Sequence, residues 1–170
     1  MPSCLITLDD IREYRPVASL DAKRVDTYII EAQENDLRLV LNDALYKALN
    51  DSFSTTIYQE LFNGKAYTYN GASIDFSGIK PMLVYFALSR IVINNQINIT
   101  SYGVVQKTVN ESQPVDNAGI KMLVTELRSV AISYQNRLID FLEKNTATYP
   151  LYNSLSKGNS NLTGLKFFRA

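Results

Sequence analysis

The longest regular pattern of apolar positions in the chain runs from Asp116 to Asn145. Apolar side chains recur there at steps of three and four residues, which keeps them on one face of a helix. No proline interrupts the stretch, and Pro114 lies just before it. We predict a single helix about 45 Å long at 1.5 Å per residue. Its inner face carries Ile120, Leu123, Val124, Leu127, Val130, Ala131, Tyr134, Leu138, Phe141 and Leu142.

Three further apolar residues of this helix, Met122, Ile132 and Ile139, lie off the main stripe. A wide core face would explain them, and so would a contact with another subunit. The spacing alone does not separate the two explanations. If subunits pack side by side, these residues are candidates for the interface.

A second long helix is predicted over roughly residues 79–97. Apolar residues occupy nearly its whole circumference, which is typical of a helix buried on most sides. Pro81 falls in the first turn, where its missing N–H costs no helical hydrogen bond. We expect this helix at the centre of the core, or shared between the core and a subunit interface. Its apolar residues are Leu83, Val84, Tyr85, Phe86, Ala87, Leu88, Ile91, Val92 and Ile93.

The clearest β pattern flanks Asn70-Gly71, over about residues 65–76. This pair accepts the two positive φ angles of a type I′ turn, so a small antiparallel hairpin is predicted. Because a two-stranded ribbon is marginally stable alone, we expect its base to lie on helices. Whether its tip meets a neighbouring subunit stays open. The fold is therefore predicted to be mainly α, a helical bundle with one small hairpin.

The first 60 residues show shorter helical patterns. Thr7 is placed to cap a helix from Leu8 to Tyr14, and Asn42 can restart a helix after the polar residues 33–36 interrupt the pattern. A solvated helix face is a sufficient explanation for the clustered carboxylates of this region. These carboxylates are Glu31, Glu34 and Asp36, and the apolar stripe resumes after them with Leu37, Leu39, Val40 and Leu41.

Residues 100–115 and the C-terminal tail are predicted to be mostly irregular. So long a connection between packed helices is usually functional or disordered, and of the two we favour a partner-contacting loop. The tail is unusually rich in large apolar groups, so residues 151–170 are interpreted as an extended arm that follows a single domain of residues 1–150. Packing of residues 149–155 on their own core explains that part equally well. The predicted interface comprises Met122, Ile132, Ile139, Tyr102, Val104, Val105, Tyr152, Leu155, Leu165, Phe167, Phe168 and Arg169.

Composition argues against several kinds of chemistry. The chain has no histidine, which removes the commonest general acid–base residue and most zinc and iron sites. Its single cysteine, Cys4, cannot form an internal disulfide. No phosphate-loop, dinucleotide or metal-loop motif occurs. We therefore predict no enzymatic activity, no metal and no cofactor. We also predict no membrane span, since no apolar run reaches about 18 residues.

The formal net charge is zero, but the charges are unevenly distributed. Residues 1–60 carry 11 acidic and 6 basic side chains, a net of −5, and residues 61–143 carry 6 and 7, a net of +1. Residues 144–170 carry four basic side chains and no acidic one. A neutral chain is a poor candidate for general nucleic-acid binding. Its acidic beginning and basic tail make it a candidate for head-to-tail contacts with copies of itself or with a partner, and an ordinary solvated surface explains the distribution equally well.

Several short segments between residues 5 and 152 together carry a family resemblance. They are Leu5-Ile6-Thr7, Ile11-Arg12-Glu13-Tyr14, Ile29-Ile30-Glu31-Ala32-Gln33, Asp36-Leu37, Tyr58-Gln59-Glu60-Leu61-Phe62-Asn63-Gly64, Ser101-Tyr102-Gly103-Val104-Val105, Tyr134, Phe141-Leu142 and Tyr149-Pro150. In this order they resemble the head–tail connector (adaptor) proteins of tailed bacteriophages, and more narrowly the ring proteins of crAss-like phages. The tail after Tyr152 lies outside the resemblance.

The resemblance implies a virion structural protein, made in the host cytoplasm and built as a ring, commonly of twelve subunits. Such a ring docks on the portal, joins it to the next tail component and lets double-stranded DNA pass without specific binding or catalysis. A lumen for passing DNA should avoid strong phosphate affinity, and the near-neutral or acidic body meets that condition. From the residues alone, the alternative is a helical binding module whose basic, aromatic C-terminal arm binds an acidic partner or DNA.

Overall fold

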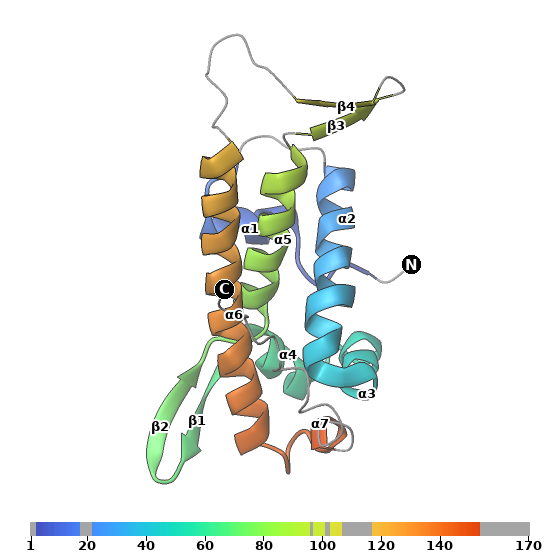
Figure 1. Ribbon diagram of the computed structural model, residues 1–170. Coiled ribbons are helices and arrows are strands. Elements are labelled where there is room, and N and C mark those ends of the chain that lie inside the picture. The colour runs from blue at the N-terminus through green and yellow to red at the C-terminus, as the bar shows by residue number, and fades with distance from the viewer. Residues whose placement is uncertain (1–2, 18–21, 96, 101–102, 107–116, 154–170) are drawn as a thin grey trace, which may run out of the picture.

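The computed structural model describes residues 3–17, 22–95, 97–100, 103–106 and 117–153 (Figure 1). Three long helices lie side by side: α2 (Ala22–Ala32), α5 (Lys80–Asn95) and α6 (Asn117–Lys144). The middle helix, α5, packs on both of the others, and the short helix α1 (Leu8–Tyr14) crosses behind it. The prediction of a mainly α fold is confirmed.

Helix α5 is the centre of the core, as its apolar circumference predicted. Met82, Leu83, Val84 and Ala87 are fully buried. The helix ends at Asn95, two residues before the predicted end, because the chain continues from Ile97 into a strand. The apolar side chains of α5 pack on α6 at one side, on α2 at the other side and on α1 behind.

Helix α6 is longer than the helix it packs against. Tyr134 of α6 stacks on Tyr85 of α5 with ring centroids 5.9 Å apart, and the two helices run in opposite directions (Figure 1). The residue of α6 level with Asn95, the end of α5, is therefore about residue 124. Leu123 lies just beyond that point and is 41% exposed, so its predicted place on the buried stripe is wrong. The buried residues of α6 are Leu127, Ala131, Leu138, Phe141 and Leu142.

The predicted hairpin is formed by β1 (Lys65–Tyr69) and β2 (Ala72–Phe76), which pair antiparallel with Lys65 opposite Phe76. Its turn residues have positive φ, 50° at Asn70 and 80° at Gly71, as an Asn-Gly hairpin turn requires. At the base, Phe76 stacks on Phe141 of α6 with centroids 4.0 Å apart. The ribbon is thus supported at its base and projects beyond the helices at its tip (Figure 1).

A second antiparallel ribbon, β3 (Ile97–Thr100) with β4 (Gly103–Gln106), follows α5. Most of this connection was predicted to be loop. The β-branched residues Ile97, Ile99 and Val104 suit a strand, but the short runs carry no hairpin turn signal as strong as Asn-Gly. The two ribbons lie at opposite ends of the helical layer (Figure 1).

The remaining helices close the lower end of the layer. A π-helical segment, η1 (Gln33–Leu37), continues α2 and leads into α3 (Arg38–Asp51). Helix α4 (Thr56–Asn63) then ends at Gly64, whose φ of 95° favours glycine. The last described element is the short α7 (Pro150–Asn153), which packs on α3.

Candidate functional site

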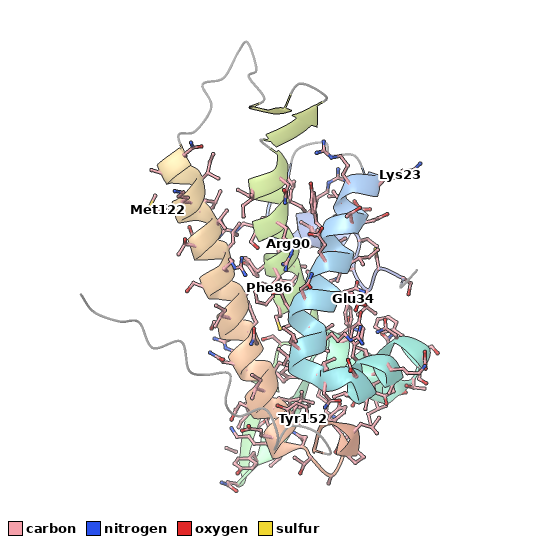
Figure 2. All side chains as sticks on the ribbon, turned by 45° about the vertical axis from the view of Figure 1, so that its right-hand side comes forward. Lys23, Glu34, Phe86, Arg90, Met122 and Tyr152 are labelled. Carbon is pink, nitrogen blue, oxygen red and sulfur yellow. The ribbon has the colours of Figure 1, made fainter. Side chains whose placement is uncertain are left out.

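The outer side of α6 exposes large apolar side chains. Met122 is 73% exposed and points away from the other helices, and Ile132 is 47% exposed (Figure 2). Ile139 is half-buried. A wide core face therefore does not explain Met122 and Ile132 within one chain, which leaves contact with another molecule as the explanation to test.

These side chains form a broad face rather than a narrow row. At about 100° per residue, Ile132 and Ile139 differ by about 20° around the helix, while Met122 lies about 80° from Ile132. Lys121 and Arg128 accompany them; among the described residues neither has a carboxylate within ion-pair distance, although Arg128 is close enough to Asp36 to oppose the rise of its pKa. We refer to Lys121, Met122, Arg128 and Ile132 as the outer α6 face.

On the opposite side of the layer, Leu39 is 77% exposed. Its predicted place on a buried stripe is wrong. The fully buried neighbours Leu37 and Leu41 are four residues apart and share one face, and Leu39 between them points the other way. The spacing could have separated Leu39 from these neighbours, since two residues are about 200° apart around a helix.

The π-helical segment sends three polar side chains in three directions. The first is Gln33, which is fully buried. Its Oε1 accepts a hydrogen bond from the Leu5 backbone N–H at 2.7 Å, and its Nε2 donates to the Ser3 carbonyl at 3.1 Å. The side chain thus fixes the N-terminal segment against α2.

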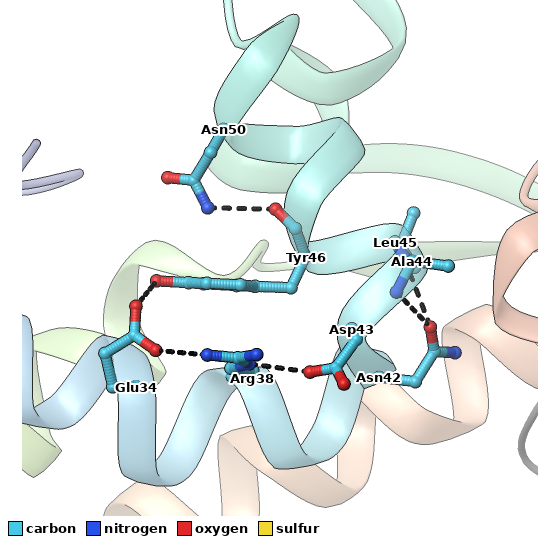
Figure 3. Close-up of polar contacts among 8 residues, drawn as sticks. All are labelled: Glu34, Arg38, Asn42, Asp43, Ala44, Leu45, Tyr46 and Asn50. Carbon is cyan, nitrogen blue, oxygen red and sulfur yellow. Dashed lines mark hydrogen bonds and ion pairs between the residues drawn. The ribbon is translucent and has the colours of Figure 1, made fainter. Parts of the chain in front are cut away.

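The second polar side chain, Glu34, joins the segment to α3 (Figure 3). Its carboxylate accepts hydrogen bonds from Arg38 Nη1 and from the Tyr46 hydroxyl, both at 2.8 Å. Arg38 also donates to Asp43 at 2.6 Å. The bonds from Arg38 and Tyr46 lower the pKa of Glu34.

The third, Asp36, joins the segment to α5. Its Oδ2 lies 2.7 Å from Arg90 Nη2, and both side chains are largely enclosed. Arg90 also donates to the Phe86 carbonyl at 3.2 Å and lies 3.7 Å from Glu31. Burial raises the pKa of Asp36 although Arg90 and Arg128 oppose that shift. The prediction of a solvated face is therefore wrong for Asp36, and the signal that could have found it is Arg90, a charge within the apolar run of α5.

Asn42 is the point where α3 bends. Its backbone, at φ 64° and ψ 166°, is not helical, and its Oδ1 accepts hydrogen bonds from the N–H groups of Ala44 and Leu45 (Figure 3). The predicted restart of a helix at this residue is confirmed. Its Nδ2 donates to the carbonyls of Leu151 and Tyr152 at 3.2 and 3.4 Å, so one side chain both caps α3 and holds α7.

The other predicted interface residues have several locations. Tyr152 is only 6% exposed, so its ring packs on its own core, the alternative that the sequence left open. Val104 and Val105 belong to β4. The structure does not bring these residues together with the outer α6 face. Tyr102, Leu155, Leu165, Phe167, Phe168 and Arg169 lie outside the described residues.

The described residues offer no cluster of three or more cysteine, aspartate or glutamate side chains that could hold a metal ion. Within the same ranges, none of the helices combines the length and apolar character needed to cross a membrane. The buried polar groups Gln33 and Asp36 are engaged by the fold itself. What the described surface offers is contact area, above all on the outer α6 face.

Comparison with known proteins places most of the chain in one family. Residues 37–161 match DUF6712, a family of unknown function. The chain belongs to DUF6712. The matched part begins within η1 and includes α3 to α7, so α5 and α6 of the helical layer belong to the family's shared region, whereas α1 and α2 precede it. No curated protein and no solved structure matches the chain.

Proposed function

We propose that this chain is the subunit of a ring-forming adaptor at the head–tail junction of a tailed bacteriophage. The ring docks on the portal, joins it to the next tail component and leaves a channel for DNA. The observation that carries the proposal is the outer α6 face, where Met122 and Ile132 stand exposed on a long helix. The family resemblance of residues 5–152 supplies the kind of assembly.

Energetics support a protein–protein role for this helix. Full burial of a methionine or isoleucine side chain contributes about 1.5–3 kcal/mol. Single exposed apolar residues are common on protein surfaces, but two large ones on the same outer face suit a protein interface. A side-by-side arrangement of such helices forms the wall of a ring.

A structural rather than enzymatic role fits the polar groups as well. The chain lacks histidine, and its most enclosed carboxylate, Asp36, is bound to Arg90. A zero net charge suits a channel through which DNA must slide, because each lysine or arginine contact with phosphate strengthens binding.

The test is the location and assembly of the full chain. We expect virion particles to contain it, and we expect electron microscopy of the purified protein, alone and mixed with portal protein, to show annular particles. Native mass spectrometry would count the subunits, for which the resemblance suggests twelve. Absence from purified virions, together with failure to bind portal, would overturn the proposal.

A further inference from the structure

The two outer edges of the helical layer differ in charge. Residues 26–43, which form most of α2, η1 and the start of α3, contain five acidic side chains and one basic, a net of −4. Residues 117–137 of α6 contain three basic side chains and one acidic, a net of +2. Arg90 of α5 lies within ion-pair distance of Asp36 and Glu31, and Arg38 pairs with Glu34 and Asp43, so the net charge of the segment with Arg90 is −3. We refer to residues 26–43 as the acidic edge, which lies on the far side of α5 from α6 (Figure 1).

Each edge also exposes a large apolar side chain, and the two lie at about the same level. The stacking of Tyr85 on Tyr134 places Arg90 beside about residue 129 of α6, because α5 and α6 run in opposite directions. Arg90 binds Asp36, and α2 and α6 run the same way along the layer (Figure 1). Leu39, three residues after Asp36, is therefore about level with Ile132.

We infer that the outer α6 face of one copy packs on the acidic edge of a second copy, with Ile132 against Leu39. This contact rests on the proposed function and names the surfaces that would build the ring wall. In a ring, neighbouring subunits are related by rotation about one axis. If that axis is parallel to the helices, one edge of a subunit's helical layer meets the opposite edge of the neighbouring subunit's layer, which gives a head-to-tail contact. It places Lys121 next to the acidic edge, whereas Arg128 already acts on Asp36 of its own chain. A two-fold contact between two α6 helices would instead oppose cations with cations.

Two blocking variants test the contact. Leu39→Glu blocks the acidic edge, and Met122→Glu with Ile132→Glu blocks the outer α6 face. Each adds charge at an exposed position, so circular dichroism and melting should show an intact fold. We expect each variant alone to weaken self-association of the full chain at least about 10-fold by analytical ultracentrifugation. Ser54→Glu, in the exposed turn after α3, is the matched control and should assemble like the wild type.

Mixing and charge exchange make the test specific. The two blocked variants each keep one intact surface, so a mixture should form 1:1 dimers and no larger species. Ile132→Glu combined with Leu39→Lys in one chain should regain assembly. The proposed contact is overturned if the wild-type chain stays monomeric, or if neither variant weakens its assembly. It is also overturned if the mixture of the two variants forms no dimer. If virions contain the chain, those outcomes overturn the contact and leave the proposed function standing. If virions lack the chain but its assembly needs both surfaces, the contact stands and the proposed function is overturned.

Discussion

Arg90 of α5 and Asp36 of η1 lie 2.7 Å apart, with side chains that are 16% and 13% exposed. The two atoms are Arg90 Nη2 and Asp36 Oδ2, and their distance is that of an ion pair between opposite charges. The pair therefore depends on electrostatic attraction in an enclosed place. It joins the centre of the core to the π-helical segment.

The first prediction concerns this pair. Asp36→Ala should destabilise the fold by about 3 kcal/mol, because it leaves the Arg90 charge enclosed without its main partner. Replacing both residues, Asp36→Leu with Arg90→Met, should recover most of the loss, since apolar groups of similar size need no counter-charge. Urea unfolding of both variants checks this. A double variant less stable than Asp36→Ala would contradict it.

The second prediction concerns the bend at Asn42. Its φ and ψ fall in a region that is essentially restricted to glycine. Asn42→Gly should cost about 1 kcal/mol, because it loses the side-chain hydrogen bonds but relieves the backbone strain. Asn42→Ala should cost about 1–2 kcal/mol more, since it loses the same bonds and keeps the strain. Denaturant midpoints measure the difference, and equal stabilities would show that the backbone is not strained.

The third prediction is a pH dependence at Asp10. Burial alone would raise the pKa of Asp10, but hydrogen bonds from Lys80 and Thr7 lower it overall, below its ordinary value of 3.8. An acid with a depressed folded-state pKa contributes stability that is fully present above the unfolded-state pKa and is lost as pH falls through the folded-state pKa. Asp10→Asn should cost about 1–2 kcal/mol at neutral pH.

Thermal melts across a pH series test the sign of this effect. The difference between wild type and Asp10→Asn should be constant near neutral pH and shrink below about pH 4. Asp9→Asn is the control, because Asp9 is 87% exposed and makes only a surface ion pair with Arg12. A stability difference between the two proteins that grows as the pH falls would refute a lowered pKa of Asp10.

The fourth prediction compares two glycines with positive φ. A Cβ on Gly64 would lie 2.3 Å from the Phe76 carbonyl oxygen, whereas one on Gly71 would meet nothing within 4 Å. Gly64→Ala should therefore cost about 3 kcal/mol or more, from strain and the backbone clash together. Gly71→Ala should cost about 1–2 kcal/mol from strain alone. Calorimetry of both variants compares them, and similar losses would mean that the backbone relaxes around Gly64.

The sequence was most informative where one physical effect dominates. The apolar circumference around Pro81–Arg90, the stripe from Leu127 to Leu142 and the Asn70-Gly71 turn each predicted an element that is present. In each case burial or turn chemistry leaves few alternatives. Boundaries were less certain, because the end of α5 depends on the strand that follows.

Other features depend on which segments meet in space. The pairing of Asp36 with Arg90 depends on how the α2–η1–α3 segment sits against α5. Periodicity cannot report this, since it describes each helix separately. For the apolar residues of the outer α6 face, the sequence predicted either a wide core face or a subunit contact. It did not decide between them, because spacing does not show where a neighbouring helix ends.

Helix α6 also connects the two kinds of surface mechanically. Phe141, which supports the base of the β1–β2 ribbon, and Met122 on the outer face are 19 residues apart on one unbroken helix, about 29 Å at 1.5 Å per residue. Over that length the helix acts as a stiff lever. A force on the ribbon that tilts α6 at Phe141 would therefore displace Met122 as well. A load on the β1–β2 ribbon would in this way move the outer α6 face.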